Sequence, residues 1–226
     1  MSPPPAELVS IALGSEHRVS GLLQLPPSAR ACYVFAHGAG AGMAHRFMEA
    51  IASGLSEASV ATLRFQFPYL EAGRRRPDPP ELCHATVRAA VAEAGRLVPG
   101  LPLIAGGRSF GGRMSSQAQA GAPLPGVLGL AFLGFPLHPA GRPSQERARH
   151  LFEVALPMLF LQGARDELAE RSLIERVTQE LGERATLSLI AEADHSFHVP
   201  ARSGRNDRQV MAELVSTLAE WIASLS

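Results

Sequence analysis

Ser109 is the residue whose surroundings most clearly suggest chemistry. It lies between Gly107 and Gly111, after an apolar run over residues 101–105 and before a helix-compatible segment. A strand that ends at glycines, turns sharply and continues as a helix exposes a serine hydroxyl at the turn, and small flanking residues allow the strained backbone. Because this spacing is a weak signal in a chain rich in glycine and serine, it indicates a nucleophile only together with the residues that follow.

A serine hydroxyl needs a neighbouring imidazole to take its proton and a carboxylate to orient that imidazole. His195 is the predicted base because it follows the last predicted strand; His198 is a competitor further into the same loop. Asp166, in the loop after the strand that begins at residue 157, is the predicted acid. Glu167 and Asp194 are alternatives, although Asp194 is disfavoured because adjacent side chains diverge and it would struggle to reach the His195 ring.

The negative charge that develops in acyl transfer needs backbone N–H donors held in advance. Phe110, directly after the serine at the start of its helix, is predicted to supply one donor. The loop after the apolar strand 31–36 reads His-Gly-Ala-Gly-Ala-Gly, and its small residues allow backbone amides to approach a substrate. Ala39 is the predicted second donor, with Gly40 as the second choice.

The elements that position these residues alternate along the chain. After an opening hairpin over 6–26, buried strands alternate with amphipathic helices, which predicts a mostly parallel sheet covered on both faces. Ligands bind such sheets at the carboxyl ends of the strands, and every candidate above follows a strand. We expect one domain over 1–226, with further strands at 31–36, 60–67, 101–105, 127–135, 157–161 and 186–190, and helices at 45–55, 80–98, after Ser109, at 146–154, at 168–181 and from the cap Asn206 to 225.

Composition excludes several classes of protein. The 226 residues carry equal numbers of basic and acidic side chains, 21 each, so a dedicated nucleic-acid binder is disfavoured. Every basic residue is arginine, which removes Schiff-base, pyridoxal-phosphate and P-loop chemistry. Cys32 and Cys83 are expected to be buried free thiols, and no metal or cofactor site is predicted. The sequence shows no signal peptide or membrane span, so a cytoplasmic protein is expected.

Six segments together resemble the α/β-hydrolase superfamily, in particular its small dienelactone-hydrolase-like branch, which includes testis-expressed and chromatin-complex relatives. They are AHGAGAGM, RFQFPY, GGRSFGGRMSS, GFPLHP, FLQGARDEL and DHSF. The resemblance covers residues 31–198 and implies an eight-stranded sheet, second strand antiparallel, with a Ser109–His195–Asp166 triad. Dienelactone hydrolase itself uses a cysteine nucleophile, so the serine here favours ordinary ester chemistry.

The sequence therefore predicts a serine hydrolase that cleaves small carboxylic esters or thioesters through an acyl-enzyme on Ser109. The segment where many such hydrolases insert a cap, residues 134–149, is short, which predicts an open site with little or no lid. The arginines at 74–76 lie in a loop on the predicted active-site side, where a solvated loop is favoured over contact with an anionic substrate. An inactive interaction module, an acyltransferase or a peptidase on the same fold are the alternatives; the sequence does not indicate the oligomeric state.

Overall fold

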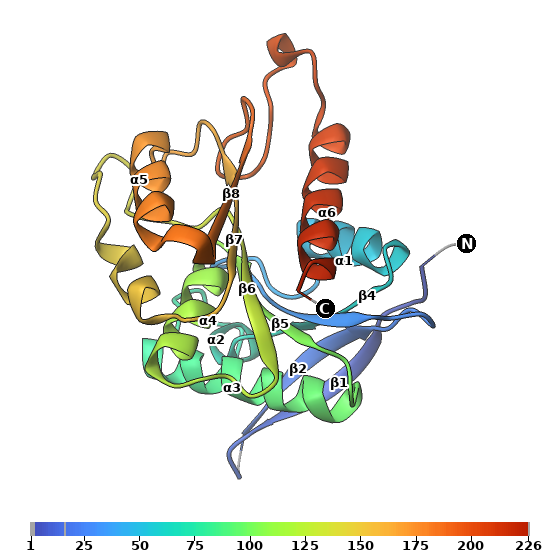
Figure 1. The fold of residues 1–226 in the computed structure, drawn as a ribbon. Helices are drawn as coiled ribbons and strands as arrows, with labels where there is room; N and C mark the ends of the chain where they lie inside the picture. Colours follow the sequence, from blue (N-terminus) through green and yellow to red (C-terminus); the bar gives the residue numbers. More distant parts are fainter. Residues whose placement is uncertain (1–2, 16, 226) are drawn as a thin grey trace.

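One mixed sheet organises the computed structural model, which describes residues 3–15 and 17–225. Its strand order is β1-β2-β4-β3-β5-β6-β7-β8 (Figure 1). Strand β2 is antiparallel to both of its neighbours, and the pairs from β4 to β8 are all parallel. The strands are β1 (Glu7–Leu13), β2 (His17–Gln24), β3 (Ala31–Ala36), β4 (Val60–Phe65), β5 (Leu103–Arg108), β6 (Val127–Leu133), β7 (Met158–Gly163) and β8 (Ala185–Ile190).

Helices cover both faces of this sheet (Figure 1). Helices α1 and α6 pack against one face, and α3, α4 and α5 pack against the other. The sheet therefore separates two apolar cores. The helices are α1 (Arg46–Glu57), α2 (Pro68–Glu71), α3 (Pro80–Leu97), α4 (Phe110–Gly121), α5 (Arg171–Leu181) and α6 (Asp207–Ala223), with 3-10 turns η1 (Glu146–Glu153), η2 (Gly182–Arg184) and η3 (Ala201–Ser203).

The central strands are buried throughout because both of their faces are covered. Every residue of β3, β4 and β7 is buried, so these strands lack the in-out alternation of a half-exposed sheet. The eight-stranded α/β-hydrolase architecture with an antiparallel second strand is thus confirmed. Asn206 caps α6 as predicted: its Oδ1 accepts from Gln209 N–H, and its own N–H donates to Gln209 Oε1, which completes a capping box.

Two predicted segments differ in detail. The loop after β4 contains the short helix α2, because Pro68 occupies its first turn, where a missing backbone N–H costs nothing. The predicted helix at 146–154 is instead the 3-10 turn η1. It packs on α4 and α5, and Ser116 Oγ lies 2.8 Å from His150 Nε2 between α4 and η1.

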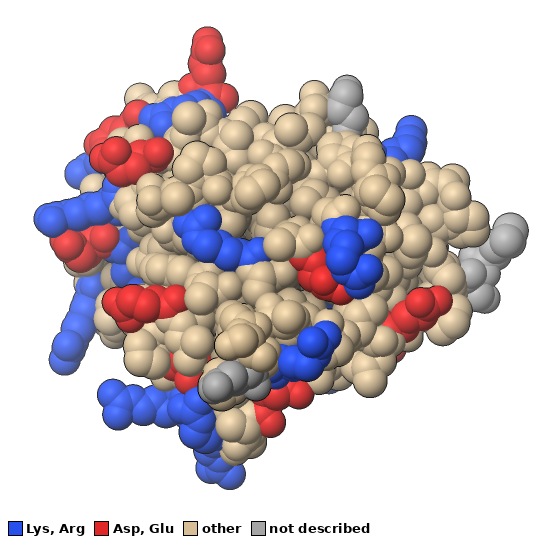
Figure 2. Space-filling model, turned by 90° about the horizontal axis from the view of Figure 1, so that it is seen from below, with Lys and Arg blue, Asp and Glu red and all other residues tan. Residues whose placement is uncertain are grey.

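Charges of both signs lie interspersed on the face shown in Figure 2, with uncharged surface between them. No helix within residues 3–15 and 17–225 combines the length and apolar character needed to cross a lipid bilayer.

Candidate active site

Ser109 occupies a strained turn between β5 and α4. Its backbone angles are φ 49° and ψ −114°, a region that non-glycine residues rarely adopt. The glycines around it are required by close packing: a Cβ placed on Gly107 or Gly111 would come within 2.4 or 2.5 Å of the carbonyl oxygen of Ala36. The predicted elbow therefore needs glycine at both positions, because β3 packs directly against the turn and leaves no room for side chains there.

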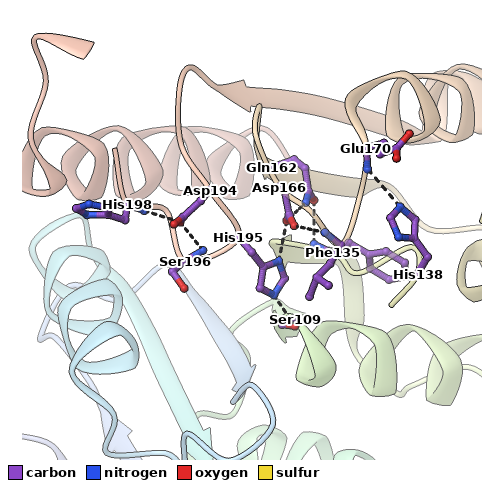
Figure 3. Close-up of polar contacts among 11 residues, drawn as sticks. Ser109, Phe135, His138, Gln162, Asp166, Glu170, Asp194, His195, Ser196 and His198 are labelled. Atoms are coloured by element: carbon purple, nitrogen blue, oxygen red, sulfur yellow. Dashed lines mark hydrogen bonds and ion pairs between the residues drawn. The ribbon is translucent and has the colours of Figure 1, made fainter. Parts of the chain in front are cut away.

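Ser109, His195 and Asp166 come together as the sequence predicts (Figure 3). His195 Nε2 lies 2.9 Å from Ser109 Oγ, and His195 Nδ1 lies 2.7 Å from Asp166 Oδ2. The Asp166 side chain is fully buried, whereas 23% of the His195 side chain is exposed. A buried carboxylate that accepts from Nδ1 leaves Nε2 free to accept the serine proton, so the imidazole is held in the tautomer a general base needs.

Asp166 is itself held by two further donors. Leu168 N–H donates to its Oδ1 at 2.8 Å, and Gln162 Nε2 donates to its Oδ2. Gln162 is completely buried at the end of β7, and its Oε1 accepts from Phe135 N–H at 2.9 Å. Gln162 thus joins the loop after β6 to the carboxylate. A polar residue ending an otherwise apolar strand, four positions before Asp166, was the signal for it in the sequence.

The alternative acid and base residues do not take part in the hydrogen-bonded chain of Ser109, His195 and Asp166. Asp194 Oδ1 accepts from the backbone N–H groups of Ser196 and His198, which closes its own loop (Figure 3). His198 Nδ1 lies 2.9 Å from Asp207 Oδ2 at an exposed position. Glu167 makes no hydrogen bond or ion pair within the part of the chain that the structure describes. Neither carboxylate nor the second histidine is therefore bonded to the Ser109–His195 pair.

The loop after β3 runs beside the elbow. A Cβ on Gly111 would come within 2.6 Å of His37 O, so the loop and the start of α4 are in direct contact. Gly40 N–H donates to the Tyr69 hydroxyl at 2.9 Å and is therefore occupied. Within the described residues the Ala39 N–H has no hydrogen-bond partner. Phe110 is the first residue of α4, where a backbone N–H has no partner inside the helix.

His37 fixes this loop as a neutral side chain. Burial lowers its pKa to about 4, opposed by a weaker effect of its hydrogen bond to Gly38 O. Its Nε2 accepts from Phe67 N–H at 3.2 Å, so Nδ1 is the donor to Gly38 O at 2.8 Å. A buried imidazole with both nitrogens engaged ties the loop after β3 to the loop after β4.

Two hollows border the His195 loop. One, of about 410 Å³, is lined by polar residues such as Arg165, Glu192 and His195. The other, of about 550 Å³, lies between the first turns of α1 and the first half of α6 and includes Arg108. Among residues 3–15 and 17–225, no three His, Cys, Asp or Glu side chains are grouped so that they could hold a metal ion.

Residues 29–223 match the alpha/beta hydrolase domain family. This chain belongs to that family. It is similar in structure to a dienelactone hydrolase from Anabaena variabilis, with a TM-score of 0.79 and 22% identity over 100% of this chain and 99% of the other. A lidless α/β serine hydrolase, XC6422 from Xanthomonas campestris, gives a TM-score of 0.73 and 20% identity over 97% and 96%. The esterase domain of a Rhodothermus marinus protein gives 0.73 and 16% over 96% and 98%. The similarity to these structures shows that this α/β hydrolase shares their fold.

Proposed function

We propose that this α/β hydrolase is a serine hydrolase that cleaves carboxylic esters or thioesters of small, short-chain acyl groups. The observation that carries the proposal is the continuous hydrogen-bonded chain from Ser109 through His195 to the buried Asp166, built on a strained elbow. A scaffold without turnover would gain nothing from a strained serine aligned with a histidine base. This favours the enzyme over an interaction module.

Ser109 Oγ attacks the acyl carbon while His195 Nε2 takes its proton, and Asp166 stabilises the imidazolium. The N–H groups of Phe110 and Ala39 receive the developing oxyanion; each such donor contributes about 3 kcal/mol of transition-state stabilisation. His195 then returns the proton to the leaving group, which leaves an acyl-enzyme on Ser109. Water, activated by the same histidine, releases the acid.

The segment between β6 and β7 supports an open site. Its turn η1 packs on α4 and α5 rather than extending over the elbow, and Ser116 and His150 join it to α4. A site without a cap encloses its substrate poorly, which favours small acyl groups over buried long lipids. The structures of a lidless serine hydrolase and of an esterase domain with the same fold support this reading.

The test is hydrolysis of 4-nitrophenyl esters from acetate to palmitate by the wild type and by Ser109→Ala. We expect turnover of the short esters and a loss of kcat of about a thousandfold or more in the variant, because nucleophile and base act as a unit. Ser116→Ala, which changes a buried serine on the same helix, is the matched control.

A fluorophosphonate probe separates the remaining alternatives. Labelling of the wild type but not of Ser109→Ala, combined with ester turnover, supports the hydrolase. Equal inertness of both proteins towards the esters and the probe contradicts it and favours the interaction module. Accumulation of transferred acyl product in place of free acid would indicate an acyltransferase.

A further inference from the structure

Arg108 directly precedes the proposed nucleophile and carries a positive charge. It ends β5 half-buried, and its guanidinium makes no hydrogen bond or ion pair to any residue that the structure describes. Its Cζ lies 4.5 Å from the centre of the Phe47 ring. A guanidinium that is partly removed from water, lies over an aromatic face and feels an acidic charge only at longer range retains most of its capacity to bind an anion.

Its position connects it to the proposed reaction centre. The Cγ and Cδ atoms of Arg108 lie 3.9 Å from where a Cβ on Gly38 would be, so its stem runs along the loop that carries Ala39. Phe47, which it covers, stacks on Phe197 with ring centres 5.8 Å apart, two residues beyond His195. The guanidinium thus lies between the loop after β3, which carries Ala39, and the loop after β8, which carries His195.

Arg108 lines a hollow together with several apolar side chains. Such a lining is suited to a ligand that carries a negatively charged group on an apolar chain. It has a volume of about 550 Å³, and its apolar lining includes Phe47, Val210, Met211 and Leu214. Its charged and titratable lining residues are Arg108, Arg46, His45 and Asp207.

The acidic groups near this hollow are already engaged. Asp207 accepts from His198 Nδ1 and from Val199 N–H, and Asp194, whose charge also reaches Arg108, accepts from two backbone N–H groups. The charge of Arg108 contributes, after burial, to the lowered pKa of His45. Two arginines against one carboxylate leave the lining of the hollow with more positive than negative charge.

We propose that the substrates of this site are esters that carry an anionic carboxylate, which Arg108 binds while the apolar walls of the hollow pack against the spacer. This rests on the proposed ester hydrolysis by Ser109 and specifies its substrate class. Arg108 is a specificity-determining residue: a carboxylate accepts two parallel hydrogen bonds from a guanidinium, and a neutral group of equal size leaves the cation unpaired.

The experiment compares matched esters with the carboxylate on either side of the scissile bond. Mono-4-nitrophenyl adipate and 4-nitrophenyl hexanoate differ only in a terminal carboxylate or methyl group on the acyl side. The pair 4-butyryloxybenzoate and 4-butyryloxybenzamide places the same difference on the leaving group. We expect a kcat/KM at least about tenfold higher for the anionic member of one pair, which identifies the side that faces Arg108.

Arg108→Gln is expected to remove this preference while the neutral esters remain within about threefold of wild type, which also shows that the variant is folded. Arg108→Lys keeps the charge without the planar fork and is expected to retain part of the preference. Arg75→Gln, at an exposed arginine outside the hollow, should change neither.

Equal rates for both members of both pairs in the wild type overturn the proposal. An equal loss on neutral and anionic esters in Arg108→Gln also overturns it, because that pattern indicates structural support of the neighbouring loops. If Ser109→Ala leaves all ester turnover unchanged, the proposed hydrolase function fails first, and the two failures are therefore distinguishable.

Discussion

Gln162 links the proposed acid to the loop after β6. It donates to Asp166 Oδ2 and accepts from Phe135 N–H, so it holds the carboxylate that faces His195. Replacing it by Met preserves length but removes both hydrogen bonds. A hydrogen bond to a charged group contributes about 1.5–3 kcal/mol, so we expect Gln162→Met to lower kcat about tenfold or more with little change in KM.

The readout is steady-state kinetics on a short ester together with the rate of fluorophosphonate labelling. Gln117→Met, on α4 away from Asp166, is the matched control and should leave both rates near wild type. A rise in KM with unchanged kcat in Gln162→Met would show that the residue supports substrate binding rather than the orientation of Asp166.

Residue types and order were enough to predict Ser109, His195 and Asp166 as neighbours, because each follows a strand of the same sheet. Gln162 was not predicted: its place as a polar residue at the end of an apolar strand is visible in the sequence, but its role depends on a backbone N–H from another strand end, which the sequence pattern does not show. The sequence could not predict either that the Arg108 guanidinium makes no ion pair with the residues that the structure describes, because ion pairing depends on distances between separate loops.

At the scale of elements, two loops that follow neighbouring strands hold each other. The Tyr69 hydroxyl, at the start of α2, accepts from Gly40 N–H, and Tyr69 N–H donates to Asp78 Oδ2 at 2.7 Å. Asp78 also pairs with Arg74 at 2.6 Å. The buried Asp78 carboxylate therefore holds Tyr69, and Tyr69 in turn holds the loop over 37–42. Ala39, which precedes Gly40 in this loop, has an N–H without a hydrogen-bond partner among the described residues.

Tyr69→Phe tests this connection. It leaves the Gly40 N–H without its acceptor, so we expect a loss of about 1–3 kcal/mol in the free energy of unfolding. Because the freed loop no longer holds the Ala39 N–H in place, kcat should fall while KM changes little. Urea denaturation and ester kinetics measure the two effects. Tyr33→Phe removes a buried hydroxyl bonded to Ala131 O and should affect stability but not kcat; a fall in kcat there too would contradict a specific role for Tyr69.

Element boundaries were less predictable than element order. Apolar runs identify β3, β4 and β7 because both of their faces are buried, and a polar cap identifies the start of α6. Whether residues 146–153 form an α-helix or a 3-10 turn depends on how they pack on α4 and α5, which periodicity does not record. The sequence pattern does not predict the short helix α2, because a proline after an apolar run also indicates the end of a strand.

At the scale of the whole molecule, the sheet divides the interior into two cores. Strands β3 to β8 contribute to both cores, whereas β1 and β2 contribute only to the core that α3, α4 and α5 cover. We propose that residues 1–226 form one domain, and we therefore expect both cores to unfold in one transition. Folding removes two histidines largely from water. His37 begins the loop after β3, and His150 lies between η1 and α4.

These histidines make stability depend on pH. Burial is the main cause that lowers the pKa of each to about 4, and for His150 the charges of Arg113 and His84 lower it further. In the unfolded chain both titrate near their ordinary pKa of 6.5. Below that pH the unfolded state binds protons that the folded state excludes, so stability is lost as pH falls from about 6.5 towards 4.

Each histidine is expected to cost about 2 kcal/mol of the free energy of unfolding between pH 7 and pH 5. His150→Gln still offers Ser116 a hydrogen-bonding group but cannot take up a proton. Between pH 7 and pH 5 the free energy of unfolding of this variant should therefore fall by about 2 kcal/mol less than that of the wild type. Urea denaturation at the two pH values measures the difference, with His17→Gln, at an exposed strand position, as the control. An unchanged pH dependence in His150→Gln would mean that His150 takes up a proton as readily in the folded protein as in the unfolded chain, and would contradict the lowered pKa of this histidine.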